Sequence, residues 1–427
     1  MASLGVRHEM HADACCPWWR AVRACSTGIV LAAVLAGCAS LPRNPVPAEL
    51  ADEAIVSGMP DIRAWAGTAS ASMEQDYRLS LAQESPVDFP CGADGNIRYP
   101  YLALSGGGSS GAFGAGFLKG WSDSGRRPVF KIVTGVSTGA LMAPFAFLGS
   151  GYDEVLHHFY TTTRTRDVFT PGSPLVALMR RDAVADTGPL ADLIERYVDT
   201  ALLERIAAAH RQGRRLYVGT VDLDSRGFAV WNMGLIAERG DFEALALFRR
   251  IMLASSSVPV AFPPVLFEVE ANGRRYDEMY VDGFIGANVF LNAGTFDMSG
   301  LYRSAGRGPG HGEIFVIHNG QLHAPPDPTS RSLRGIALRS VETAGRAGVV
   351  GDLFREFTFA RQNGADFHWV TIDESVVLPD PLAFGPGGNG RAVRRRLPGR
   401  NLGTGLEGAA AGNESGGAGV RMKRVAA

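Results

Sequence analysis

The sequence has little cysteine: five residues in a chain of 427. Four of them precede residue 40, and the fifth is Cys91. No CxxC pair and no cluster of His and Cys with zinc-ligand spacing occurs. A disulfide framework is therefore excluded, and we expect no metal and no cofactor.

The chain also lacks an excess of charge of either sign. Lys and Arg number 42 against 43 Asp and Glu, which gives a formal net charge of −1. The basic residues gather only at the end, where residues 386–427 hold eight Lys/Arg against two Asp/Glu. Without a basic footprint on the body of the chain, nucleic acid is not expected as a partner.

No apolar run reaches the length of about 20 residues that a transmembrane helix needs. The nearest is Ile29–Leu35, which follows Arg20 and Arg23 and is typical of a secretory signal. The segment Leu35-Ala36-Gly37-Cys38 resembles a bacterial lipobox. It predicts cleavage before Cys38 and attachment of lipid to its thiol, with further acyl chains anchoring the protein.

We therefore expect a signal peptide over residues 1–37 and a lipid-anchored protein of the bacterial cell envelope. In bacterial lipoproteins, the absence of Asp after Cys38 implies the outer membrane. The alternatives are an ordinary signal with an incidental cysteine and an uncleaved anchor. Met1 and Met10 are both candidate starts.

The composition along the chain predicts three further parts. Residues 38–98 are rich in Ala, Pro and Ser and are expected to form a tether and pre-domain segment. Residues 99–375 carry the apolar runs expected of the main folded domain. Residues 376–427 are expected to be a disordered Gly/Arg-rich tail, because no Phe, Trp, Tyr or Ile follows Phe384.

The apolar runs predict an α/β fold with three layers, in which helices flank a mostly parallel central sheet. Tyr101–Leu104 and Phe130–Thr134 are each followed by a glycine-rich turn and a helical stretch, which is the pattern of a parallel-sheet unit. Further strands are expected at Leu216–Val221, Glu313–His318 and Phe367–Ile372.

The first glycine-rich turn is Gly106-Gly107-Gly108-x-x-Gly111. A dinucleotide site would need an acidic residue at the end of the next strand, and Val133-Thr134-Gly135 holds none. A P-loop would need a following Gly-Lys-Ser/Thr, which is also missing. The remaining interpretation is a glycine-rich turn whose backbone N–H groups face the cleft as an oxyanion hole.

The second turn, Gly135-x-Ser137-x-Gly139, has the pattern of a nucleophile elbow between a strand and a helix. It lies about 30 residues after the first turn. Because the carboxyl ends of parallel strands share one edge of a sheet, both turns should meet at one cleft. A chance turn of small residues is the alternative for this motif.

The base that would activate Ser137 has two kinds of candidate. A triad would need a histidine, and those that follow the serine in the expected strands and loops are His311, His318, His323 and His368. Asp282 is the other candidate, because it stands beside Gly283 at the end of an apolar-polar stretch. On spacing alone, an ordinary Asp-Gly turn is the favoured interpretation of Asp282-Gly283.

Together these motifs resemble the patatin-like phospholipases: Gly106-Gly107-Gly108-x-x-Gly111-Ala112, Gly135-x-Ser137-x-Gly139 and Asp282-Gly283 stand in the family's order. The segment Ala254-Ser255-Ser256-Ser257-Val258-Pro259 also resembles the family's stretch before the aspartate. The resemblance covers about residues 99–375.

The resemblance implies a Ser–Asp dyad that works without histidine, metal or cofactor. Ser137 would be the nucleophile, Asp282 the base, and Gly106, Gly107 and Gly108 the oxyanion loop. Two positions depart from the family's pattern. Ser110 stands where many members have Arg or Lys, and Phe284 stands where Gly or Ala is usual.

The expected function is a lipid acyl hydrolase of phospholipase A or lysophospholipase type. It would cleave carboxylic esters of membrane phospholipids or other acyl-ester lipids through an acyl-enzyme, at a membrane surface reached through lipidated Cys38. A Ser-His-Asp esterase of small soluble esters and a non-catalytic lipid-binding lipoprotein are the alternatives.

Overall fold

A computed structural model describes residues 41–56, 58–93, 95–171, 183, 185–305, 311–323 and 326–385, together with the backbone of Lys423 and Arg424. The signal segment and Cys38 lie outside the described residues. Residues Met1–Pro42 separate as a unit from Arg43–Ala427. Among the described residues, no helix is long and apolar enough to cross a membrane.

A mixed sheet of eleven strands forms the centre of the unit Arg43–Ala427, in the order β1-β9-β10-β7-β4-β3-β11-β12-β13, with β8 on β7 and β2 on β8. The strands are β1 Ile55–Val56, β2 Arg63–Trp65, β3 Arg98–Leu104, β4 Ile132–Val136, β7 Arg215–Asp222, β8 Gly227–Asn232, β9 Val265–Ala271, β10 Arg274–Asp282, β11 His311–His318, β12 Asp366–Thr371 and β13 Lys423–Arg424. A separate pair joins β5 Thr170–Pro171 to β6 Ala185–Asp186.

The five central strands, β7, β4, β3, β11 and β12, are parallel. Each overlaps one of the five apolar runs from which strands were predicted, with bounds that differ by at most three residues, so this part of the fold is confirmed. The strands that flank this parallel core are antiparallel, including the β9–β10 hairpin and its contact with β7. The sheet is therefore mixed, with its parallel part confined to the middle.

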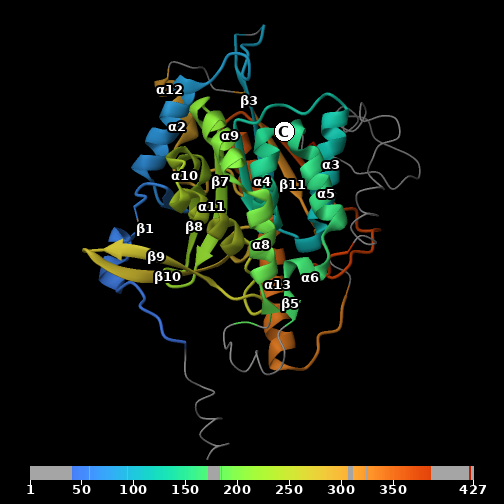
Figure 1. Cartoon of the computed structure of the whole chain (residues 1–427). Helices are drawn as coiled ribbons and strands as arrows, with labels where there is room; N and C mark the ends of the chain where they lie inside the picture. Colours follow the sequence, from blue (N-terminus) through green and yellow to red (C-terminus); the bar gives the residue numbers. More distant parts are fainter. Residues whose placement is uncertain are drawn as a thin grey trace, which may run out of the picture. The chain divides into compact units, whose positions relative to one another are not determined.

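Both faces of the sheet are covered, which gives the expected three layers (Figure 1). Successive residues of β3 bury into opposite faces: Leu102 and Leu104 into one core, Tyr101 and Ala103 into the other. Helices α3, α4, α5 and α8–α11 pack into the first core, and α2, α12 and α13 into the second. The helices are α2 Ala71–Gln83, α3 Gly111–Asp123, α4 Thr138–Leu148, α5 Asp153–Thr162, α6 Thr165–Val168, α8 Gly188–Tyr197, α9 Thr200–Arg211, α10 Met233–Arg239, α11 Phe242–Ser255, α12 Met298–Ser304 and α13 Leu333–Gln362.

The segment expected as a tether is part of the folded unit from Arg43 onward. It supplies β1, β2 and α2 to the sheet and to one of its covering layers. Tyr77 of α2 is fully buried and stacks on Phe296 with ring centroids 4.8 Å apart. The aromatic and apolar residues scattered through this Ala-rich stretch are enough to dock it.

The folded unit also continues beyond residue 375. Residues 376–385, which we name the C-terminal strap, pack on the domain through Val376, Leu378, Leu382 and Phe384. The expected boundary at residue 375 therefore falls too early, because these apolar side chains still find partners in the core. Further on, β13 pairs with β12 at the edge of the sheet.

Candidate active site

The strands β4 and β10 approach one another along the same edge of β7. In the parallel ladder Val136 of β4 lies opposite Gly219, and in the antiparallel ladder Asp282 of β10 lies opposite Thr220. Because β8 pairs with β7 along Tyr217–Asp222, β4 and β10 must share the opposite edge. The two strands therefore end at neighbouring positions, and this brings Asp282 to the residue that follows β4, Ser137.

Ser137 lies in a sharp turn between β4 and α4. Its backbone has φ 56° and ψ −125°, an unfavourable conformation for a residue with a Cβ. Such strain costs about 1–3 kcal/mol and clusters at functional sites. A Cβ at Gly135 would come 2.4 Å from Gly139 O, and one at Gly139 would come 2.2 Å from Leu104 O. Both glycines of the predicted elbow are therefore needed for close backbone packing.

The Ser137 side chain contacts the predicted base directly. Its Oγ donates a hydrogen bond to Asp282 Oδ2 at 2.6 Å, and the Phe284 N–H donates to Asp282 Oδ1 at 3.0 Å. Asp282 is completely buried, and Ser137 is 8% exposed. Burial raises the pKa of Asp282 to about 7, although both hydrogen bonds favour the ionised carboxylate. Asp282 can therefore accept a proton near neutral pH.

A serine that received no separate role from the sequence holds the elbow in place. The Ser137 N–H donates to Ser255 Oγ at 3.0 Å, and Ser255 Oγ donates to Gly219 O of β7 at 2.7 Å. The Asp282 N–H donates to Ser257 O at 2.9 Å. The end of α11 thus connects both halves of the dyad to the sheet. In the sequence, the role of Ser255 was indicated only by the run Ser255-Ser256-Ser257 before Val258-Pro259.

The first glycine turn lies against the nucleophile. A Cβ at Gly106 would come 3.1 Å from Ser137 Cβ and 3.7 Å from Ser137 Oγ. Within the described part of the chain, the N–H groups of Gly106, Gly107 and Gly108 donate no hydrogen bond to another residue. The three donors therefore have no partner among the described residues, and Gly106 lies next to Ser137, which is compatible with the predicted oxyanion hole.

The four histidine candidates are placed elsewhere. Neither Ser137 Oγ nor the Asp282 carboxylate has a histidine as hydrogen-bond partner among the described residues. The buried His318 Nδ1 lies 3.0 Å from Ser105 Oγ, and burial lowers the pKa of His318 to about 4. The exposed His323 pairs with Glu374, and His368 stacks on Phe315. His311 begins β11.

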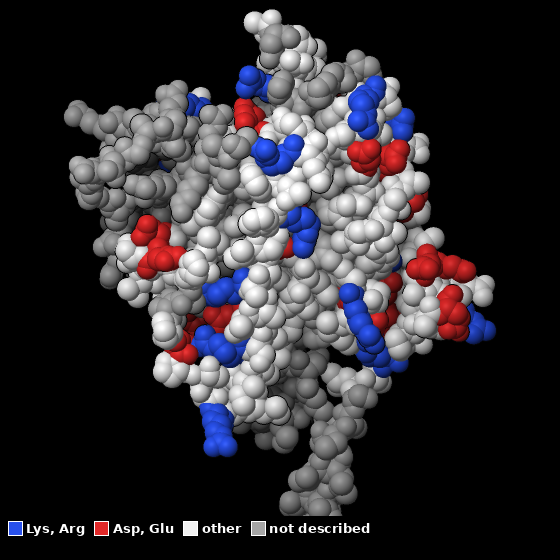
Figure 2. Space-filling model, turned by 180° about the vertical axis from the view of Figure 1, so that it is seen from behind, with Lys and Arg blue, Asp and Glu red and all other residues white. Residues whose placement is uncertain are grey.

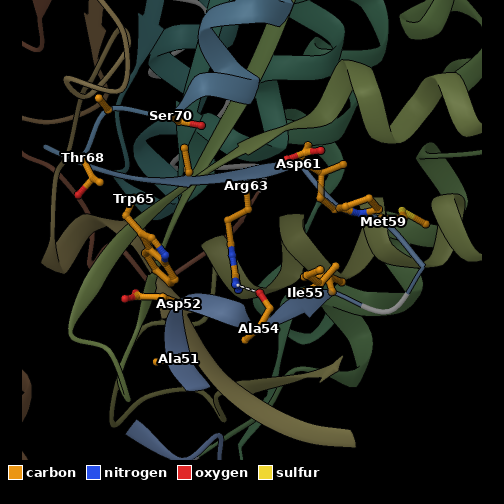
Figure 3. A pocket seen from close by; sticks show the side chains of 15 residues that line it. Ala51, Asp52, Ala54, Ile55, Met59, Asp61, Arg63, Trp65, Thr68 and Ser70 are labelled. Atoms are coloured by element: carbon orange, nitrogen blue, oxygen red, sulfur yellow. Dashed lines mark hydrogen bonds between the residues drawn. The ribbon is translucent and has the colours of Figure 1, made fainter. Parts of the chain in front are cut away.

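A cavity of about 260 Å³ lies away from the dyad, and all of its lining comes from residues 51–70 (Figure 3). Arg63 is the one basic residue of this lining. Its guanidinium donates a hydrogen bond to Ala54 O and forms an ion pair with Glu278. The cavity therefore offers no free buried cation to a ligand. No group of three or more His, Cys, Asp or Glu able to hold a metal occurs among the described residues.

Charged side chains of both signs are mixed on the face seen from behind. Figure 2 shows Lys and Arg side chains interspersed with Asp and Glu across that face. A phosphate backbone would instead require a stripe of positive charge.

The comparisons with known proteins point to one family. Residues 102–293 match the family model described as patatin-like phospholipase. No curated protein sequence matches the chain significantly.

Three solved structures resemble the chain at low sequence identity. VipD from Legionella pneumophila is 11% identical, with 72% of this chain and 70% of that one covered and a TM-score of 0.27. Human GIVD cytosolic phospholipase A2 is 11% identical, with 76% and 56% covered and a TM-score of 0.31. The type III effector protein ExoU is 14% identical, with 72% and 56% covered and a TM-score of 0.28.

The chain spans a little over half the length of the last two of these proteins. TM-scores this low do not by themselves establish a relationship, so the assignment rests on the family model. Residues 102–293 of the chain are thus similar to the patatin-like phospholipases, and this similarity supports lipid ester hydrolase activity.

Proposed function

We propose that this protein is a lipid acyl hydrolase that cleaves carboxylic esters through a dyad of Ser137 and Asp282. The observation that carries the proposal is the 2.6 Å hydrogen bond from Ser137 Oγ to a completely buried carboxylate. A serine hydroxyl is a weak nucleophile and needs an adjacent base. Asp282 has a pKa raised to about 7 by burial and suits that task at neutral pH.

In the first half-reaction, Ser137 Oγ attacks the ester carbonyl carbon while Asp282 Oδ2 takes the hydroxyl proton. The negative charge that develops on the carbonyl oxygen is stabilised by the free N–H groups of Gly106, Gly107 and Gly108. The positive end of α4 also points at this position, since the helix begins at Thr138. The bond to the alcohol then breaks, and Asp282 gives its proton to the leaving oxygen.

In the second half-reaction, water attacks the acyl group carried by Ser137. Asp282 accepts a proton from this water and returns it to Ser137 Oγ as the fatty acid leaves. One ester and one water therefore yield one alcohol and one carboxylic acid, and both side chains return to their starting state.

The triad esterase is the second candidate. It is less well supported. The buried His318 is hydrogen-bonded to Ser105, the residue before the oxyanion loop, and burial lowers the pKa of His318 to about 4. A histidine that stays neutral and lies outside the Ser137–Asp282 pair is poorly suited to serve as the base.

The test is turnover of p-nitrophenyl esters and phospholipid vesicles by purified variants. Ser137→Ala and Asp282→Asn should each abolish turnover, and the double variant should be no worse than either single one, because the two residues act as a unit. The exposed His323→Ala and the buried His318→Gln should stay active. A folded, active Asp282→Asn enzyme beside an inactive His318→Gln enzyme would instead establish the triad.

A non-catalytic lipid carrier is the third candidate, and a fluorophosphonate probe separates it from an enzyme. The probe should label the wild type at Ser137 and leave Ser137→Ala unlabelled. Lipid binding without labelling would favour the carrier.

We further propose that the protein acts on membrane phospholipids or related acyl-ester lipids from a lipid anchor at Cys38 in the bacterial envelope, at the outer membrane. The support is the Leu35-Ala36-Gly37-Cys38 motif after an apolar run. Cys38→Ala should abolish incorporation of labelled fatty acid and release or misprocess the protein. Unchanged incorporation would contradict the anchor while leaving the dyad unaffected.

A further inference from the structure

The C-terminal strap, residues 376–385, is attached to the domain at both of its ends. At its start, Gln321 Nε2 donates to Asp373 O and to Val376 O, both at 2.7 Å. At its end, Thr165 of α6 holds Phe384 with three hydrogen bonds. Thr165 N–H donates to Phe384 O at 3.0 Å, Thr165 Oγ1 donates to the same oxygen at 3.0 Å, and Phe384 N–H donates to Thr165 Oγ1 at 2.9 Å.

Between these attachments the strap passes directly over the oxyanion loop. The Ser109 N–H donates to Pro381 O at 2.8 Å, and Ser109 Oγ donates to Asp380 O at 3.3 Å. Gly108 has φ +55°, and a Cβ there would come 2.1 Å from Pro381 O. The strap carbonyl therefore packs on the open face of Gly108 and fixes the direction of the peptide that joins Gly108 to Ser109.

The opposite side of the loop is bounded by the end of β11. A Cβ at Gly107 would come 1.9 Å from Asn319 O, and Asn319 Nδ2 donates to Ser105 O at 2.9 Å. The two central glycines thus lie between two backbone carbonyls, one from Asn319 and one from Pro381. Asn319 directly follows a core strand, whereas Pro381 belongs to a segment whose position depends on its own attachments.

We propose that the C-terminal strap is a positioning element of the active site, and that Thr165 is its anchor. By holding Phe384, Thr165 keeps Pro381 O against Gly108 and Ser109, and so keeps the N–H groups of the loop directed at the oxyanion beside Ser137. This inference rests on the proposed function for its catalytic consequence. Its structural half, the dependence of the loop on Thr165, stands independently.

The test compares two substitutions of Thr165 in the full-length protein. Thr165→Val keeps the shape of the side chain and removes both of its hydrogen bonds to Phe384, whereas Thr165→Ser keeps the hydroxyl. A matched control is Thr358→Val, since Thr358 Oγ1 donates to Phe354 O at 2.8 Å on the exposed side of α13. The readouts are kcat and KM on p-nitrophenyl butyrate, the melting temperature, and amide hydrogen exchange of peptides covering residues 105–113.

For Thr165→Val we expect kcat to fall about tenfold with KM within about twofold of wild type, because donors that drift from the oxyanion lower transition-state stabilisation more than substrate binding. Exchange at residues 105–113 should rise, because the Ser109 N–H loses a fixed acceptor. Thr165→Ser and Thr358→Val should match the wild type in both readouts.

Unchanged exchange over residues 105–113 in Thr165→Val would overturn the proposal, and so would a rise of equal size in Thr358→Val. A wild-type kcat despite raised exchange would overturn its catalytic half. Failure of the dyad has a separate readout, because Ser137→Ala would then keep the wild-type rate whatever Thr165→Val does.

Discussion

At the scale of single residues, the environment of Asp282 decides the chemistry. An aspartate in water has a pKa of about 3.9 and holds an abstracted proton poorly at neutral pH. Complete burial raises the pKa of Asp282 to about 7, while the hydrogen bonds from Ser137 and Phe284 limit that rise. In the proposed mechanism, burial thus lets this weak base accept a proton at neutral pH without a histidine partner.

The pH dependence of kcat/KM follows from this raised pKa. Only the ionised Asp282 can accept the Ser137 proton, so kcat/KM should rise with pH through about 7, level off above, and fall tenfold per pH unit well below. Initial rates on a soluble p-nitrophenyl ester between pH 5 and 9 measure this profile.

Glu356 of α13 provides the control for this profile. It is also buried, and burial raises its pKa to about 7, but its carboxylate accepts a hydrogen bond from the Leu291 N–H and has no hydrogen bond to Ser137. Glu356→Gln should therefore keep the inflection near 7. Its disappearance in this variant would assign the titration to Glu356 instead of Asp282.

Phe284, a departure from the family pattern, is placed to limit the space beside the nucleophile. Its Cβ lies 3.8 Å from the position a Cβ would take on Gly106, and its ring packs on Gly345 of α13. Phe284→Ala should open this wall and raise the ratio of kcat/KM for a dodecanoyl ester over a butanoyl ester by about tenfold. Phe242→Ala, at an exposed position on α11, should leave the ratio unchanged. An unaltered ratio in Phe284→Ala would show that the acyl chain takes another path.

At the scale of elements, α2 is bound to the sheet by a buried ion pair. Arg215 Nε of β7 donates to Asp76 Oδ2 at 2.6 Å, and both side chains are buried. Asn232 Nδ2 donates to the same oxygen at 2.8 Å. The ion pair therefore joins α2, which precedes the segment matched by the family model, to β7, which pairs with both β4 and β10.

Asp76→Ala should destabilise the protein by about 3–5 kcal/mol, because it leaves the Arg215 charge buried without its partner. Urea unfolding should show a lower midpoint with the slope unchanged. Glu74→Ala on the same helix is the control, since Glu74 pairs with Arg78 on the surface and exposed pairs contribute about 0–1 kcal/mol. Equal effects of the two substitutions would mean that α2 is not held by Asp76.

At the scale of the whole molecule, the functional boundary at the C-terminus lies after the strap. Removing residues 386–427 should change the melting temperature and the esterase rate little, because that stretch holds no aromatic residue to bury and its described part is the two-residue strand β13.

Removing residues 376–427 instead should lower kcat, because the strap no longer contacts Gly108 and Ser109. Comparing the two truncated proteins by thermal melting and ester turnover checks this boundary. A large fall in melting temperature or esterase rate after removal of residues 386–427 alone would mean that this tail itself docks on the domain.

The sequence by itself determined the parallel core strands, the two glycine turns and the identity of the Ser137 and Asp282 candidates. These features are local: apolar runs bounded by turns specify strands, and Gly135-x-Ser137-x-Gly139 supplies the small residues that a sharp elbow needs. The α/β class and the helices on both faces follow from the same periodicity.

Only the tertiary structure decided that, among the described residues, Asp282 and not a histidine is hydrogen-bonded to Ser137 Oγ. That outcome depends on the register of β4 and β10 against β7, which places Val136 opposite Gly219 and Asp282 opposite Thr220. Register between residues more than 60 positions apart in the sequence, as in these two pairs, is set by packing of the whole sheet and leaves no local pattern. The position of the strap was likewise decided by the tertiary structure. Pro381 O contacts the backbone of Gly108, and the composition of residues 376–385 does not predict this contact.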